Sequence, residues 1–291
     1  MKPPQFKYFD PASAEEALAL LHEWGDEGKI LAGGQTLMPM LNFRTLSPAA
    51  LIDINGLASL GQHAHTKDGT VIGALTRQQA LEDDDALATH QPLVAAAIPF
   101  IAHRAIRNRG TVGGSLAHAD PAAEWGALIL TLEAELTVRR HQAPDRVVTA
   151  ADFFGGLLET ALEPDELLVE VRLPRWPQGA GWSFIEFSRR HGDFALAGVA
   201  CMISLSADGT CGNVRMTAFG AGPRPIRLAL AETQLRGQQP GPDAVREAAR
   251  RGAKEISPFD DNHASAAYRR HLIEVLAERS LADALTRTAR H

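Results

Sequence analysis

Apolar residues recur at helical spacing near the start of the chain. The residues expected on one helix face are Ala14, Ala17, Leu18, Leu21 and Trp24. Ser13 precedes them and is followed three residues later by Glu16, which is the spacing of a capping box. Short aliphatic runs at 29–32 and 51–54 are typical of buried strands. The pattern predicts a small α/β unit at the N-terminus.

A larger mixed unit is predicted between residues 70 and 173. Strands are expected at 70–75, 135–139 and 166–173. Helices are expected at 77–81, at 92–106 and from residue 121 through Leu132. Thr76 is a plausible cap for the first of these helices, and Asp120 for the third, where Pro121 would occupy the first turn.

Prolines at 174 and 177 and glycines at 179 and 181 predict a boundary before the last part of the chain. Three strand-like runs follow, at 182–187, 197–205 and 213–219, and they predict an antiparallel meander. After an entry turn at 222–227, helices are expected at 228–235, 243–254 and 263–288. The whole pattern predicts an α+β protein.

Composition narrows the classes of function. The chain has 291 residues, of which 45% are hydrophobic, and a net charge of -6, which argues against a nucleic-acid partner. It shows no long apolar run and no secretory or transit signal, so we expect no membrane span and a cytoplasmic location. Two cysteines are too few to ligate an iron–sulfur cluster, so any such cluster is expected in another chain.

Two glycine-rich turns are the strongest chemical signal. Residues 32–36 read AGGQT and residues 111–115 read TVGGS, and each turn pairs two glycines with a hydroxyl residue. Adjacent glycines can expose backbone N–H groups to a diphosphate, and Thr36 and Ser115 add donors. One such turn is more often a tight connection, but two favour a nucleotide site between subdomains. Neither turn has the GxGxxG or P-loop spacing, so a Rossmann or P-loop site is not expected.

The segments AGGQTLMPMLNFR and AHRAIRNRGTVGGSLAHADPAAEW carry a family resemblance, together with LIDINGL, IGALT, LLVEVRLP and FSRRHGDFALAGVA further along. Over nearly its whole length the chain resembles the FAD-binding medium subunit of the carbon monoxide dehydrogenase and xanthine dehydrogenase family. This resemblance implies a two-subdomain FAD-binding domain at 1–176, divided near residue 57 into subdomains 1–57 and 58–176. That domain would be PCMH-like, as in the vanillyl-alcohol oxidase superfamily. The resemblance further implies a C-terminal domain at 177–291 with a three-stranded antiparallel sheet and a helical bundle.

The resemblance also implies how a non-covalent FAD is held. The two glycine turns would clasp the diphosphate, while Asp120 and Glu124 would accept hydrogen bonds from ribityl or ribose hydroxyls. Phe194 would lie over the isoalloxazine ring and control access to it. Leu168 would lie near the adenine, although it reads equally well as a core leucine, and Asp120 as a cap. The full expected set is Ala32, Gly33, Gly34, Gln35, Thr36, Leu37, Thr76, Thr111, Val112, Gly113, Gly114, Ser115, Asp120, Glu124, Leu168, Asp193 and Phe194.

We expect the histidines of this chain to have structural roles and not to bind a metal or the flavin. His118, His191 and the pair His63 and His65 have no partner at metal-ligand spacing, so we expect no metal site. We expect no covalent flavin link at His103 or His118, and no catalytic side chain beyond the gating role of Phe194.

By resemblance, the chain is expected to relay electrons within a molybdenum hydroxylase complex. A large subunit would carry the molybdenum cofactor, and a small subunit would carry 2Fe–2S clusters that reduce the FAD of this chain. An external acceptor such as NAD, oxygen, a quinone or a carrier protein would then be reduced, and the assembly would be a dimer of heterotrimers. Two alternatives stay open: a self-sufficient FAD-dependent oxidase or dehydrogenase, and a non-enzymatic nucleotide-binding assembly factor.

Overall fold

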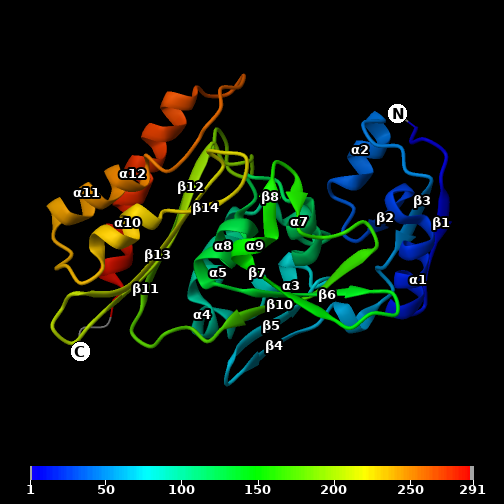
Figure 1. Ribbon diagram of the computed structural model, residues 1–291, viewed down its shortest axis with the longest axis horizontal. Helices are drawn as coiled ribbons and strands as arrows, with labels where there is room; N and C mark the ends of the chain where they lie inside the picture. The colour runs from blue at the N-terminus through cyan, green and yellow to red at the C-terminus, as the bar shows by residue number, and fades with distance from the viewer. Residues whose placement is uncertain (1, 289–291) are drawn as a thin grey trace.

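Three β-sheets follow one another along the long axis of the molecule in the computed structural model, which describes residues 2–288 (Figure 1). The N-terminal sheet lies at one end, a five-stranded sheet with short helices forms the centre, and the C-terminal sheet with its long helix lies at the other end. The α+β class expected from the sequence is therefore observed.

The N-terminal unit is a parallel sheet with strand order β1-β3-β2. Its elements are β1 (Lys7–Phe9), α1 (Ala14–Trp24), β2 (Gly28–Leu31), α2 (Leu37–Phe43) and β3 (Ala50–Asp53). Ser13 caps α1 as predicted, since its Oγ accepts the Glu16 N–H, but Glu16 accepts the Ala12 N–H at 2.8 Å instead of the Ser13 N–H of a standard capping box. This arrangement places the first glycine turn directly between β2 and α2.

The central sheet is antiparallel, with strand order β4-β5-β10-β6-β7. The strands are β4 (His63–Thr66), β5 (Gly69–Gly73), β6 (Glu135–Arg140), β7 (Arg146–Thr149) and β10 (Glu166–Pro174). Seven short helices belong to this unit: α3 (Gln78–Glu82), α4 (Leu87–His90), α5 (Pro92–Ala97), α6 (Arg104–Arg107), α7 (Val112–His118), α8 (Glu124–Leu132) and α9 (Ala150–Phe153). A small hairpin of β8 (Phe154–Gly156) and β9 (Glu159–Thr160) completes it. The largest core cluster forms around the fully buried Trp125.

Two predicted caps in the central unit are wrong. Thr76 uses its hydroxyl to donate to the Gln62 carbonyl at 3.0 Å, and the helix begins at Gln78 instead. Asp120 accepts the Ala122 N–H at 2.9 Å within a turn, and α8 begins only at Glu124. Both side chains satisfy backbone groups in turns, which is the competing use of short polar residues.

The helix predicted at 92–106 is interrupted. It ends as α5 at Ala97, passes through a 3-10 turn that contains Pro99, and resumes as α6 at Arg104. Pro99 lacks an N–H donor, and Ala102 has a φ of 45°, which no α-helix accommodates. The break sends the chain back toward the second glycine turn.

The C-terminal unit contains β11 (Gly181–Phe187), β12 (Ala197–Leu205), β13 (Cys211–Phe219) and β14 (Ile226–Arg227), in that spatial order and antiparallel. The expected three strands are present, but the end of the predicted entry turn adds β14 as a short fourth strand. The helices are α10 (Ala229–Leu235), α11 (Pro242–Gly252) and α12 (Ala266–Thr286). Among residues 2–288, no helix has both the length and the apolar character needed to cross a membrane.

The C-terminal unit is fastened to the chain that follows the second glycine turn. The Gly220 N–H donates to the Pro121 carbonyl at 2.8 Å, and the buried hydroxyls of Thr131 and Thr217 lie 2.8 Å apart. Because α8 packs against β13, the C-terminal sheet has a fixed position beside residues 120–132.

Candidate functional site

The two glycine turns, separated by almost eighty residues in sequence, are in contact. A Cβ atom on Gly33 would lie 2.4 Å from the Arg109 carbonyl oxygen, a distance that no side chain tolerates. A Cβ atom on Gly114 would lie 3.7 Å from the Cβ of Ala32. The absence of a side chain at Gly33 therefore permits the close approach, whereas the distance at Gly114 is an ordinary van der Waals contact.

The first turn presents uncovered hydrogen-bond donors. Among residues 2–288, none of the hydrogen bonds uses the main-chain N–H groups at 33–36. Gly34 has a φ of 70°, and the side chain of Gln35 donates to the Gly33 carbonyl at 3.1 Å, which holds the loop in shape. A run of unpaired N–H groups around such a turn forms a concavity suited to an anion.

The second turn differs from this expectation, because its N–H groups are already used. Val112 donates to the Thr76 carbonyl at 3.1 Å, and Gly113 donates to the Ala74 carbonyl at 2.8 Å. The Gly114 N–H donates to Thr111 Oγ1 at 3.1 Å, because Thr111 is the N-cap of α7. The prediction that both turns leave their amides free is therefore wrong for the second turn. The second turn instead packs against the first, at Ala32.

One side-chain network ties the two turns together, and the sequence did not reveal it. Asn55 Nδ2 donates to the Ala32 carbonyl at 2.7 Å, and Arg77 donates to Asn55 Oδ1 at 2.6 Å and to the Arg109 carbonyl. Burial alone would raise the pKa of Asp53, but hydrogen bonds from Asn55 and from a tyrosine hydroxyl, with the Arg77 charge, hold it below its usual value. The only signal was the position of Asn55 in LIDINGL, directly after a strand.

A cavity of 470 Å³ opens at the first turn. Its lining residues are Leu31, Ala32, Gly33, Gly34, Gln35, Met38, Pro39, Asp53, Asn55 and Arg109. Burial, together with the nearby charge of Arg109, lowers the pKa of Arg77. The guanidinium group of Arg109, next to uncovered N–H donors, makes this cavity suitable for a phosphate group.

Buried carboxyl groups from two units gather beyond the second turn. Burial raises the pKa of Glu124 to about 7, and the neighbouring charge of Asp120 acts in the same direction. Burial and the charge of Glu124 raise the pKa of Glu186, on β11, to about 8. Within the described residues, Glu186 Oε2 is buried without a hydrogen-bond partner. Glu186 is a polar feature of this region that the sequence did not predict.

Asp193 and Phe194 lie on the loop before β12. The Ala195 carbonyl oxygen would be 2.8 Å from a Cβ on Gly220, whose N–H in turn binds the Pro121 carbonyl. The loop is therefore next to the segment that carries the buried carboxyl groups. The side chain of Phe194 is 62% exposed, so it is free to contact a bound ligand.

The other predicted residues have structural positions. Leu168 is 3% exposed within the main core, and Val112 and Thr76 are fully buried beneath the second turn. Thr36 is the residue before α2, and Leu37 begins that helix. Ser115 lies in the first turn of α7.

Comparison with known proteins identifies the family of this chain. Residues 4–176 match the family model for the FAD binding domain in molybdopterin dehydrogenase, and residues 182–284 match that for the CO dehydrogenase flavoprotein C-terminal domain. The chain is 41% identical over 287 residues to 6-hydroxypseudooxynicotine dehydrogenase complex subunit alpha of Paenarthrobacter nicotinovorans, covering 99% of this chain and 97% of that protein. It is 35% identical over 289 residues to the carbon monoxide dehydrogenase medium chain of Hydrogenophaga pseudoflava, covering 99% and 100% respectively.

Comparison of the fold with solved structures identifies the same family. A solved structure of carbon monoxide dehydrogenase from Hydrogenophaga pseudoflava, which lacks the Mo-pyranopterin moiety, superimposes with a TM-score of 0.96 at 36% identity. The match covers 99% of this chain and 100% of that one. The two domain models together, and the relatives, match over nearly the whole chain. The chain therefore belongs to the family of FAD-binding medium subunits of molybdenum hydroxylases.

Proposed function

We propose that this chain holds FAD non-covalently at the junction of its two glycine turns and relays electrons within a molybdenum hydroxylase complex. The observation that supports this most strongly is the contact of the two turns at a cavity whose N–H donors are uncovered. When bound, FAD supplies the ability to accept electrons singly and to release them in pairs.

The protein groups act by binding and orientation. The N–H groups at 33–36 would donate to diphosphate oxygens, and Arg109 would balance their charge. Gly113 and Gly114 would let the second turn approach the cofactor, with the Ser115 hydroxyl as a further donor. The neighbouring members of the predicted set, Ala32, Leu37, Thr76, Thr111 and Val112, would hold the two turns in position.

We assign the flavin side of the site to the region where the C-terminal unit meets α8. Asp120 and Glu124 would accept hydrogen bonds from ribityl or ribose hydroxyls, and Leu168 would approach the adenine through its backbone. Phe194, with Asp193 beside it, would cover the isoalloxazine ring. We also propose that the chain consists of a FAD-binding domain at 1–176, with subdomains 1–57 and 58–176, and a C-terminal domain at 177–291.

Partner subunits would supply the other centres. The relatives are named as medium chains or as one subunit of a complex, which implies large and small partners. We propose that the large partner carries the molybdenum cofactor and binds the substrate, and that the small partner carries 2Fe–2S clusters. Both cysteines of this chain are buried and free, so they are unsuited to cluster ligation. We further propose that the complex is a dimer of heterotrimers and that it reduces an external electron acceptor.

Co-purification with the neighbouring gene products tests the relay. We expect a yellow complex that releases FAD on denaturation and contains iron and molybdenum in the partner chains. Reduction of the isolated flavin chain by an organic substrate, without partners, would favour a self-sufficient oxidase or dehydrogenase. A colourless chain that does not take up FAD would favour a nucleotide-binding assembly factor instead.

Replacing Phe194 tests its place over the flavin. In Phe194→Ala we expect FAD affinity to fall about 2- to 10-fold, because one aromatic contact contributes about 0.5–1.5 kcal/mol. Flavin fluorescence in the bound state should rise, since ring stacking quenches it, and Phe194→Tyr should restore both properties. The matched control is Phe187→Ala, which removes another exposed aromatic ring of the same unit. Equal effects of the two alanine variants would contradict the assignment.

A further inference from the structure

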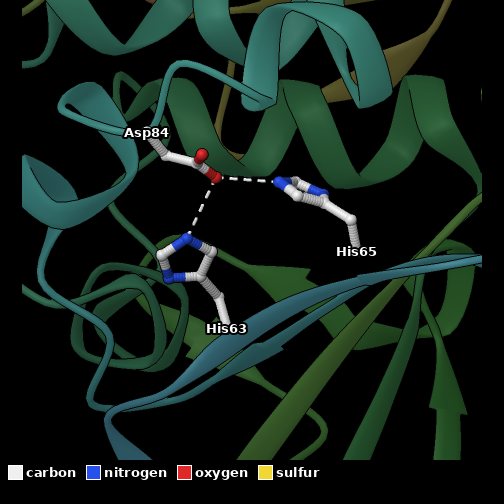
Figure 2. A group of neighbouring side chains, drawn as sticks. All are labelled: His63, His65 and Asp84. Carbon is white, nitrogen blue, oxygen red and sulfur yellow. Dashed lines mark hydrogen bonds and ion pairs between the residues drawn. The ribbon is translucent and has the colours of Figure 1, made fainter.

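Two histidines and one aspartate form a cluster that does not belong to the cavity at the glycine turns (Figure 2). His63 and His65 alternate along β4, so both side chains lie on the same face of the central sheet. Asp84 reaches them from the connection between α3 and α4. The cluster thus joins the edge strand of the sheet to the helical layer beside it.

The three side chains converge on one point. Asp84 Oδ2 lies 3.0 Å from His63 Nε2 and 2.8 Å from His65 Nε2. One ligand atom from each residue lies within 4.8 Å of the others. Two imidazole nitrogens are thus directed at a single carboxylate oxygen, and Figure 2 shows both rings pointing toward Asp84.

Neighbouring groups fix these side chains in orientation. The other nitrogen of His65, Nδ1, lies 2.9 Å from the hydroxyl of the fully buried Thr70. Asp84 Oδ1 accepts the Ala86 N–H at 3.0 Å, and the ring of His90 stacks on that of His65 with centroids 4.2 Å apart. A hydrogen bond at the far nitrogen of a histidine is the usual support of a metal-ligating imidazole.

The charge at the cluster suits a cation. Asp84 supplies a carboxylate that receives the contacts of both imidazoles and the Ala86 N–H. The neighbouring Asp83 is engaged with Arg104 at 3.0 Å and does not compete as a ligand. The three cluster side chains are only 14–22% exposed, so the site is largely shielded from solvent.

We propose that His63, His65 and Asp84 bind a first-row divalent cation, Zn²⁺ by preference, with a water molecule in the fourth position. Zn–N and Zn–O bonds of about 2.0–2.2 Å in tetrahedral geometry set ligand atoms roughly 3.3 Å apart, so the nitrogen–oxygen contacts need to open by only a few tenths of an ångström. Two imidazoles and one carboxylate suit Zn²⁺ better than Mg²⁺ or Ca²⁺, which prefer oxygen ligands. The bound ion would link β4 to the connection between α3 and α4.

Metal titration of the full chain tests this site. After exhaustive chelation, we expect the wild-type protein to bind one equivalent of Zn²⁺ by calorimetry and to give the visible absorption of four-coordinate Co²⁺ with that metal. Asp84→Asn should weaken Zn²⁺ affinity at least about tenfold, since it removes the charged ligand while its remaining oxygen can still accept the Ala86 N–H. Zn²⁺ should raise the Tm of the wild type more than that of this variant.

Matched variants separate this site from the other histidines of the chain. Asp85→Asn makes the same change one residue away, on an exposed side chain, and should leave Zn²⁺ binding unchanged. His63→Gln should lose binding in parallel with Asp84→Asn, and FAD content reports that each variant is folded. Equal Zn²⁺ affinities in Asp84→Asn and Asp85→Asn, or no stoichiometric binding by the wild type, would overturn the proposal.

Discussion

Gly33→Ala is expected to lower FAD affinity about ten- to hundredfold, because overpacking by one methyl group costs about 1–3 kcal/mol where backbone must move. The added Cβ would stand 2.4 Å from the Arg109 carbonyl oxygen and 2.9 Å from the Cα of Gly110. Neither atom belongs to a side chain that can rotate away. The two turns must separate, and the clamp that Arg77 makes between Asn55 and Arg109 opens with them.

Fluorescence titration of the FAD-free chain measures this loss directly. Gly61→Ala is the control, since a Cβ there meets only ordinary contacts, the nearest at 3.6 Å. Its FAD affinity should equal that of the wild type. If Gly33→Ala also binds FAD with wild-type affinity, the contact between the turns does not shape the site, and the proposed place of the diphosphate is wrong.

The sequence predicts contacts that depend on local spacing. The capping spacing of Ser13 and Glu16 is four residues long, and the apolar runs at 182–187 and 197–205 predict strands, the second of which is buried over its first seven residues. The two glycine turns also follow from local chemistry, because glycine is required wherever backbones approach closely. These features need no knowledge of what lies across the fold.

Features that depend on distant partners were not predictable. Whether the N–H groups of the second turn are free depends on the carbonyls of Ala74 and Thr76, almost forty residues earlier. The third member of the histidine cluster, Asp84, stands in a run of three aspartates that reads as a solvated loop. Asn55 likewise acquires its role only when β2 and β3 pair. In each case tertiary contact decides between several local uses of one polar residue.

Glu186→Gln is expected to stabilise the protein at alkaline pH and to leave its stability almost unchanged at pH 5. Glu186 is partly buried, its buried Oε2 has no hydrogen-bond partner within residues 2–288, and the charge of Glu124 acts on it. Burial, with the charge of Glu124, raises its pKa from 4.5 to about 8. Ionisation of this group in the folded protein is therefore costly, and glutamine keeps the shape without the charge.

The direction of the effect follows from proton binding in the two states. Between about pH 4.5 and pH 8 the folded chain keeps a proton on Glu186 that the unfolded chain has released, so the free energy of unfolding declines as pH rises through this window. Above it, both states are ionised and the folded state carries the whole penalty. We expect Glu186→Gln to unfold with roughly 2–4 kcal/mol more free energy than the wild type at pH 9.

Urea unfolding at pH 5 and pH 9 measures this difference, with Glu135→Gln as the control because that carboxylate is exposed on β6. Because the charge of Glu124 helps to raise the pKa of Glu186, the substitution also changes the titration of Glu124, and the measured difference belongs to the coupled pair. A gain in stability that is equal at both pH values would mean that the amide merely packs better than the acid. A gain confined to alkaline pH would show that the chain keeps a neutral carboxyl, and hence an exchangeable proton, where its C-terminal unit meets α8.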